Sequence, residues 1–217
     1  MSKLPPRLWA CLRTVSTRRL CAAASTALLV IAVFFRQSMT ATMVLHMLVH
    51  IPVILVAGVL AGQAGLLDVK PGAPGCIVHW LAKYNGHGIP GLLAVAFMMA
   101  YWMIPRSLDN VLVSDIASIG KFAGLFIAGL LLLDSLRRAD SVIKLFFLGN
   151  FAWMTAIVGL VYQENPARLC NSYLMGDQEA TGFGLVVVAA VLPMLWLWAE
   201  YRQSRQRTVR QASGFVQ

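Results

Sequence analysis

The sequence predicts an all-α membrane protein, a polytopic bundle of about six transmembrane helices with both termini in the cytoplasm. Of its 217 residues, 59% are hydrophobic and only 12% are charged, whereas about 25% of the residues in soluble domains are charged. The apolar residues form about six long blocks, and a helix needs about 20 mostly apolar residues to cross a bilayer. Their spacing follows the helical period without the alternation of strands, which disfavours a β-barrel.

The six predicted spans follow one another along the whole chain. Each is a mostly apolar run with helical period, at residues 20–35, 39–64, 87–104, 116–133, 142–162 and 179–201. The chain therefore divides into a basic cytoplasmic N-terminal segment at 1–19, a transmembrane helical domain at 20–201 and a basic cytoplasmic tail at 202–217. In the Gly- and Pro-rich connection after the second span, we expect a short interfacial helix at 76–84, whose aromatic residues suit the headgroup region.

The first span has an alternative interpretation. The apolar run is closed by Arg36, as at a helix boundary, and we expect this run to be retained as a membrane helix. The basic N-terminus, an apolar run of about 15 residues and the small residues near 38–41 also resemble a signal peptide. Cleavage would leave five spans with the C-terminus still in the cytoplasm.

The distribution of positive charge predicts the orientation. Fourteen of the 18 Lys and Arg residues fall in the two terminal segments and in the second and fourth connections. Cytoplasmic segments carry an excess of Lys and Arg, so we assign these four segments to the cytoplasmic side of the membrane. The net charge of +9 then reflects orientation in the lipid bilayer and predicts no nucleic-acid partner. The opposite side carries acids such as Asp109 and Asp177.

Local patterns add detail to three of the spans. Gly58-x-x-x-Gly62 in the second span and Gly120-x-x-x-Gly124 in the fourth allow close contact between helices. The last span begins near Asp177, where an acid in the first turn suits the helix dipole. The segment GDQEAT can therefore act as an N-terminal cap, as an alternative to a ligand role for Asp177.

The second span carries a stripe of candidate metal ligands. At about 100° per residue, one helix face holds Met39, Met43, His46, Met47 and His50. The two histidines are four residues apart, so their Cβ atoms lie about 5–6 Å from each other and both side chains can reach one ion. The stripe leads from the outer surface to a depth of about 16 Å. Imidazole and thioether ligands suit Cu(I) and discriminate against Mg and Ca, so the stripe predicts a copper site.

The same stripe also has a purely structural interpretation. Methionine is a common gap filler in packed helices, and a histidine in a membrane helix is often hydrogen-bonded to a neighbouring helix. Two histidines with flanking methionines on one face favour a site over packing alone. A bis-histidine haem is not expected, because the two axial ligands come from opposite faces of the ring and cannot both be His46 and His50 on one helix.

Three motifs follow one another between about Met39 and Trp198. They are HMLVHIPVILVAG at 46–58, AYWMIPRSLDNVL at 100–112 and GLVYQENPARLCNSYLMGDQEATG at 159–182. In this order they resemble the H-M-x-x-H-M-L-L…P, W-H-x-P…Y-D-x-A and D-Q-x-x-x-G motifs of the CtaG family of cytochrome c oxidase assembly proteins. The resemblance implies a polytopic helical membrane protein that helps to insert copper into haem-copper oxidases.

The resemblance also implies roles for individual residues. By position, His46 and His50 match the paired histidines of the family. Asp177, Gln178 and Gly182 match the D-Q-x-x-x-G motif at the start of the last span.

The chain departs from the family motifs at two places. Met103 follows Trp102 where the family has histidine, and residues 114–124 contain no histidine where a further pair is expected. Met103 ends the third span near the outer surface, and its thioether is a soft ligand that can replace the missing histidine. Asp115 can occupy one of the other places.

These observations predict a copper-handling protein and not an enzyme. No Walker A loop, Rossmann fingerprint, G-x-S-x-G or H-E-x-x-H motif occurs. We expect Cu(I) to be held near the outer face of a bacterial inner membrane, for transfer to a haem-copper oxidase subunit, by His46, His50, Met39, Met43, Met47, Met103 and Asp177. One alternative is a structural or accessory subunit of a respiratory or oxygenase complex, which the missing histidines favour. Another is a small-solute or proton transporter that uses the buried histidines.

Overall fold

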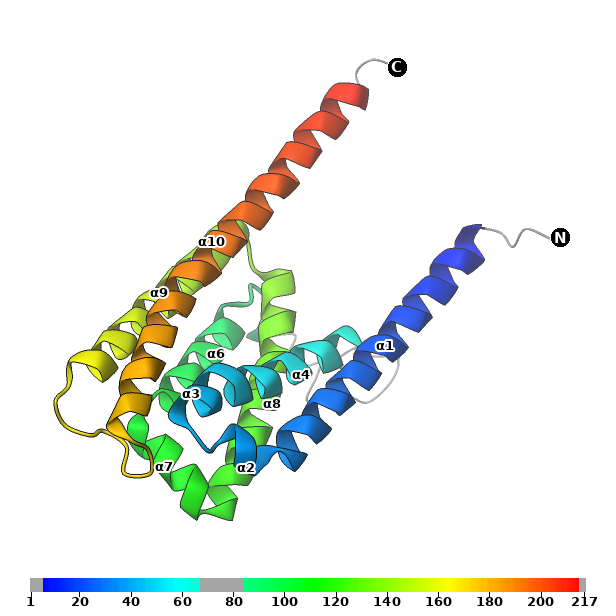
Figure 1. Cartoon of the computed structure of the whole chain (residues 1–217). Coiled ribbons are helices and arrows are strands. Elements are labelled where there is room, and N and C mark those ends of the chain that lie inside the picture. The colour runs from blue at the N-terminus through cyan, green and yellow to red at the C-terminus, as the bar shows by residue number, and fades with distance from the viewer. Residues whose placement is uncertain (1–5, 67–83, 215–217) are drawn as a thin grey trace.

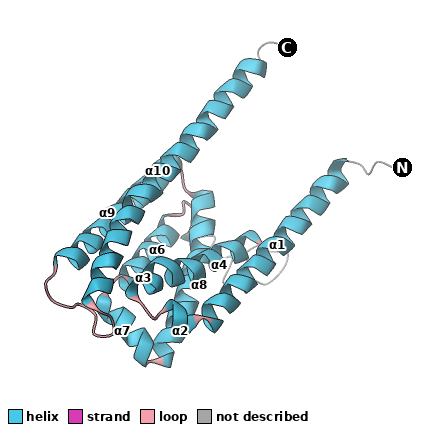
Figure 2. Cartoon of the chain, viewed as in Figure 1, coloured by secondary structure: helices cyan, strands magenta, loops and turns pink. Residues whose placement is uncertain are grey.

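The computed structural model describes residues 6–66 and 84–214, and every regular element in these two ranges is helical (Figure 2). The elements in chain order are α1 (Pro6–Phe34), α2 (Arg36–Met39), α3 (Met43–Leu45), the π-helix η1 (His46–His50), α4 (Ile51–Gln63), α6 (Ile89–Trp102), α7 (Pro105–Val113), α8 (Asp115–Arg138), α9 (Ser141–Glu164) and α10 (Met175–Gly214). Five helices are long and apolar enough to cross a membrane, or up to six if the bent pair of α6 and α7 is one span. The predicted all-α polytopic bundle is confirmed. The interfacial helix expected at 76–84 falls, except for its last residue, outside the described residues.

The N-terminal end of α1 and the C-terminal end of α10 lie on the same side of the bundle (Figure 1). The blue α1 and the red α10 extend in one direction, and α2 and α7 lie near the opposite end. α10 has 40 residues, about 60 Å of helix at 1.5 Å per residue, whereas the hydrocarbon core of a bilayer is about 30 Å thick. α10 therefore continues well beyond a membrane, into the segment that the sequence predicts to be a basic tail.

α1 packs into the bundle through small residues. The Ser25 hydroxyl donates to the carbonyl oxygen of Ala57 in α4 at 2.7 Å, and Ala32 is completely buried. Loss of residues 1–38 would remove both contacts. Retention of the first span, which the sequence predicts, stays a prediction.

The crossing of α4 and α8 brings two backbones into direct contact. A Cβ atom on Gly58 would overlap the carbonyl oxygen of Phe126, and one on Gly129 would overlap the carbonyl oxygen of Leu55. Gly58 therefore makes the close contact that its spacing predicts. On α8, however, the contact is made by Gly129, because no atom lies within 4 Å of a Cβ added to Gly120.

A second close crossing joins α9 and α10. A Cβ on Gly182 would lie 2.5 Å from the carbonyl oxygen of Gly159, and a Cβ on Gly159 would lie 2.7 Å from that of Gly182. The glycine that matches the D-Q-x-x-x-G motif thus permits helix packing.

Two clusters of buried apolar residues fill the bundle. The first joins α1, α4, α6, α7 and α8 through Ala32, Ile51, Ile54, Val95, Met99, Trp102, Val111, Leu125 and Ala128. The second, which we call the methionine cluster, contains Met43, Met47, Met103, Leu108, Tyr162, Cys170, Tyr173 and Leu185. Its members are far apart in the sequence, from Met43 to Leu185, so it ties the second span to the last two helices.

Candidate functional site

The two histidines are the first and last residues of the π turn η1. The turn ends two residues before Pro52. A proline has no N–H donor, and in an α-helix its ring crowds the carbonyl group four residues earlier. The centres of the two imidazole rings are 5.7 Å apart. Isolated π turns are frequent at functional sites.

The second span starts later than the sequence predicts. A continuous helix was expected from residue 39, but the chain leaves α2 at Thr40 and re-enters a helix at Met43. The Thr42 hydroxyl caps the new start by accepting from the backbone N–H of Leu45 at 3.3 Å. A capping threonine satisfies a donor that would otherwise stay free at a helix start, so the break is encoded locally.

Lys121 of α8 reaches into the space between the two imidazole rings. Its Nζ atom lies 2.9 Å from Nε2 of His46 and 3.1 Å from Nδ1 of His50. All three side chains are completely buried. A lysine nitrogen donates through its N–H groups, so each ring accepts through the nitrogen that faces it. The two lone pairs that a metal ion would need therefore point at Lys121.

The remaining ring nitrogens also have partners. Nε2 of His50 lies 3.1 Å from the carbonyl oxygen of Ala32, which can only accept a hydrogen bond. Nδ1 of His46 lies 2.8 Å from the hydroxyl of Tyr173, and that hydroxyl donates to the carbonyl oxygen of Thr40 at 3.1 Å. His50 therefore carries its hydrogen on Nε2 and His46 carries its hydrogen on Nδ1. All four imidazole nitrogens are engaged.

The surroundings of Lys121 are positive. The lysine forms no ion pair with any carboxylate among the described residues. The charge of Arg36 interacts with it, and Nη1 of Arg36 donates to the hydroxyl of Ser118 on α8 at 3.1 Å. A buried cation in a membrane helix is costly unless it is paired or hydrogen-bonded, and here the two histidines supply the acceptors.

The methionine cluster brings together sulfur-containing side chains from distant parts of the chain. Met43 and Met47 belong to the second span, Met103 follows α6, and Cys170 lies in the loop before α10. Tyr162 fixes the backbone beside Met103 by donating to its carbonyl oxygen at 2.6 Å. The structure thus places Met103 in the same buried cluster as two methionines of the predicted stripe.

The loop at 165–174 closes over this cluster through specific hydrogen bonds. The Gln178 side chain accepts from the backbone N–H of Leu169 at 2.8 Å and donates to the carbonyl oxygen of Tyr162 at 3.1 Å. The carboxylate of Asp109 accepts from two successive backbone N–H groups of the loop, at 2.8 and 3.1 Å. Gln178, which matches a family motif, and Asp109, one of the acids that the sequence places on the outer side, therefore both position the loop.

The thiol of Cys170 is not an activated ligand. Burial, and then the nearby carboxylate of Asp109, raise the pKa of this thiol to about 12. Burial likewise raises the pKa of the Tyr173 hydroxyl, so Tyr173 remains a hydrogen-bond donor. Because the thiolate is the form of cysteine that binds metals, the methionine thioethers are the sulfur ligands that need no loss of a proton.

Two predicted ligands lie apart from the others. Met39 is the last residue of α2 and is not a member of the methionine cluster. Asp177 is half-buried in the first turn of α10, where its charge interacts with Tyr173. In residues 6–66 and 84–214, no three His, Cys, Asp or Glu side chains form a group that could hold a metal ion. His46, His50 and Asp177 therefore do not form a three-ligand site.

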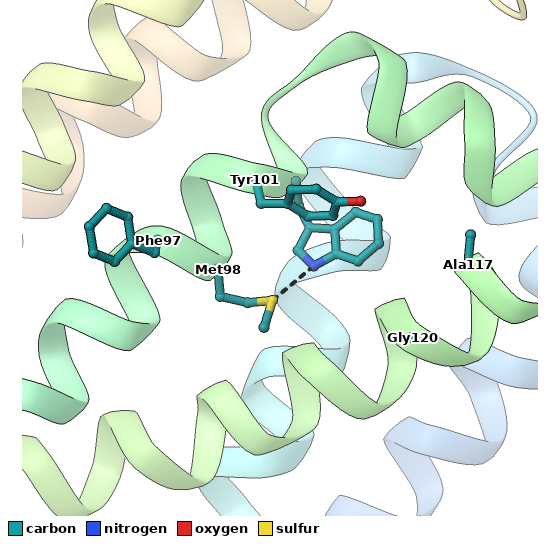
Figure 3. A pocket seen from close by; sticks show the side chains of 6 residues that line it. Phe97, Met98, Tyr101, Ala117 and Gly120 are labelled. Atoms are coloured by element: carbon teal, nitrogen blue, oxygen red, sulfur yellow. Dashed lines mark hydrogen bonds between the residues drawn. The ribbon is translucent and has the colours of Figure 1, made fainter.

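A cavity of about 380 Å³ lies beside α6 and α8 (Figure 3). Its lining is mainly apolar and consists of Phe97, Met98, Tyr101, Trp102, Ala117 and Gly120. The indole N–H of Trp102 donates to the sulfur of Met98 at 3.2 Å. Neither His46 nor His50 lines this cavity, and Met98 is the one soft ligand in its lining, so the cavity offers no set of metal ligands.

Sequence reasoning missed the residues that connect the site. Lys121 falls within the predicted fourth span at 116–133, but the sequence assigned it no role in the site. In the structure it is completely buried against His46 and His50. A lysine within an apolar span indicates a polar partner elsewhere in the bundle, since a buried cation requires one. No pattern in the sequence indicated Tyr173 as the partner of His46.

Comparison with protein-family models, with curated proteins and with solved structures finds no match to this chain. The structure establishes a multi-pass helical membrane protein. Its function is inferred below from the geometry of the site together with the sequence motifs.

Proposed function

We propose that the protein handles Cu(I) in the membrane and assists copper insertion into a haem-copper oxidase. The proposal rests on one observation, the burial of Met43, Met47 and Met103 in a single cluster next to the histidine turn. The resemblance of the motifs to oxidase assembly proteins supplies the client. The reaction is binding and release, and no covalent chemistry is involved.

The ligands of the proposed site are thioethers. Methionine sulfur is a soft and neutral ligand that suits Cu(I) better than Mg, Ca or Mn. Met43, Met47 and Met103 are each at most 7% exposed, so water is largely excluded around their sulfur atoms. His46 and His50 do not fit as ligands, because their lone pairs are directed at Lys121. Cys170 is an accessory group that would have to lose its proton first.

The place of the cluster in the fold suits delivery to a partner. Its members Met103, just before α7, and Cys170 and Tyr173, in the loop before α10, lie at the end of the bundle opposite the free ends of α1 and α10 (Figure 1). The positive-inside rule assigns the termini to the cytoplasm of a bacterial cell. The cluster would then face the outer side of the membrane. A copper ion held there would pass by ligand exchange to an oxidase subunit on that side.

The test is Cu(I) binding by the full chain in detergent under reducing conditions. In the variant Met43→Leu/Met103→Leu, we expect Cu(I) affinity to fall at least about tenfold. Exchange of methionine for leucine conserves volume and usually changes stability by less than about 1.5 kcal/mol. Met99→Leu is the matched control, because Met99 is also buried but belongs to the first cluster. Wild type and double variant with equal affinities would contradict the proposal.

A second candidate function is an accessory subunit without metal. The observation that favours it is Lys121, which comes from the segment where the family motif has histidines and fills the space between His46 and His50. In this case the methionines of the cluster only pack the interior of the bundle and bind no metal. Stoichiometric co-purification with a mature respiratory or oxygenase complex, without copper in the chain, would favour this candidate over the first.

Proton transport gains no support from the hydrogen-bond chain. The chain runs from Ala32 through His50, Lys121 and His46 to Tyr173, where the hydroxyl donates to a backbone carbonyl. It therefore ends at a carbonyl oxygen on each side, and a backbone carbonyl has no proton to pass on. All the side chains in the chain are buried.

A further inference from the structure

The pair of histidines has the arrangement of a metal site whose centre is filled by the protein itself. Two imidazole lone pairs converge on one nitrogen atom, at 2.9 and 3.1 Å. In metal sites, a ligating histidine almost always donates its other N–H to a carbonyl, a carboxylate or water, which fixes the ring. Here His50 donates to the Ala32 carbonyl and His46 donates to the Tyr173 hydroxyl. Both rings are thus held by contacts that do not involve Lys121.

We infer that Lys121 is a specificity-determining residue, an internal cation that closes the His46–His50 pair to metal ions. Imidazole binds Zn²⁺, Co²⁺ and Cu²⁺ well, and two oriented imidazoles facing one point are a binding site for such ions. With Lys121 in place, the lone pairs of both imidazoles are already engaged and are closed to a metal ion. This inference goes beyond the proposed function and does not require that the methionine cluster bind copper.

Two physical effects keep the pair closed. A divalent ion must displace the lysine nitrogen from both acceptors, and this nitrogen cannot diffuse away because it is attached to α8, which packs directly on α4. The second effect is charge. Arg36 adds a positive charge near Lys121, and no carboxylate among the described residues pairs with the lysine. A divalent ion would enter a region that is already positive, without an acid to offset its charge.

The test is Co²⁺ binding, followed by the d–d absorption of the ion, in the full chain purified in detergent. Wild type is expected to show no Co²⁺ signal that depends on His46 or His50. Lys121→Ala is expected to gain a signal and to bind Co²⁺ at least about tenfold more tightly than wild type. Addition of His46→Ala to this variant should abolish the gain. Lys121→Arg is the matched control, because it keeps a buried cation with N–H donors and should stay closed.

Several results would overturn the inference. One is a folded Lys121→Ala variant, judged by its helical circular dichroism, that gains no Co²⁺ affinity. Another is a gain that persists after His46→Ala. If Lys121→Ala does not fold, Lys121→Ser serves as the second variant, and wild type remains informative by itself. A Co²⁺ signal in wild type that is lost in His46→Ala would show that the pair is already open. Failure of Cu(I) binding in the methionine variants is a separate result, since Co²⁺ is read at the histidines.

Discussion

Replacement of both His46 and His50 with leucine is expected to lower the free energy of unfolding by about 3–5 kcal/mol. The two rings are the hydrogen-bond acceptors of the Lys121 nitrogen, at 2.9 and 3.1 Å, and all three side chains are completely buried. A hydrogen bond to a charged group contributes about 1.5–3 kcal/mol, and the buried lysine nitrogen would lose two such acceptors. Leucine fills much of the space of each ring, so cavity formation is the smaller effect.

The same reasoning predicts that the lost free energy of unfolding is regained, at least in part, when Lys121 is replaced as well. The triple variant His46→Leu/His50→Leu/Lys121→Leu is expected to be more stable than the double variant, since an apolar replacement of a whole buried polar group is often neutral or stabilising. The measurement is unfolding in mixed micelles with increasing denaturing detergent, followed by circular dichroism. His87→Leu is the control, because His87 is exposed and an exposed substitution usually changes stability by less than about 0.5 kcal/mol. A triple variant no more stable than the double variant would contradict the assignment of a buried cation.

The sequence predicts the spans because hydropathy alone decides which segments enter a bilayer. The fourth span was expected at 116–133 and α8 runs over Asp115–Arg138, and the fifth was expected at 142–162 and α9 runs over Ser141–Glu164. The predicted start of the second span, at residue 39, was less accurate, because the helix begins at Met43. Its first turn depends on a threonine cap and on a π turn next to a proline, and both are local backbone features that hydropathy does not report.

Of the candidate site, the sequence predicted the helix face that carries the ligands but not the residues that face it. Periodicity places Met43, His46, Met47 and His50 on one face, and all four are buried. Periodicity cannot reveal what faces them. Lys121 is 75 residues from His46 and Tyr173 is 127 residues away, and such long-range partners are set by how the helices cross. The identity of the partner changes the interpretation of the histidines from free ligands to acceptors of an internal cation.

Substitution of alanine for Gly129 is expected to destabilise the bundle by about 2–3 kcal/mol. The added Cβ would overlap the carbonyl oxygen of Leu55 and would lie 2.9 Å from the Cα of Gly58, so the neighbours that must move are backbone atoms. Overpacking of a tight contact typically costs about 1–3 kcal/mol, and here no side-chain rotation can relieve the overlap. The measurement is again the free energy of unfolding in mixed micelles.

Gly120→Ala on the same helix is the matched control for Gly129→Ala. No atom lies within 4 Å of a Cβ at Gly120, and alanine favours a helix over glycine by up to about 1 kcal/mol, so this variant should be as stable as wild type or slightly more stable. Equal effects of the two substitutions would contradict the close crossing of α4 and α8. The crossing also sets the site, because α4 continues directly from the histidine turn and α8 carries Lys121. A wider crossing in Gly129→Ala should therefore lengthen the contacts of Lys121 and make the histidines accessible to Co²⁺, as removal of the lysine would, whereas Gly120→Ala should leave them closed.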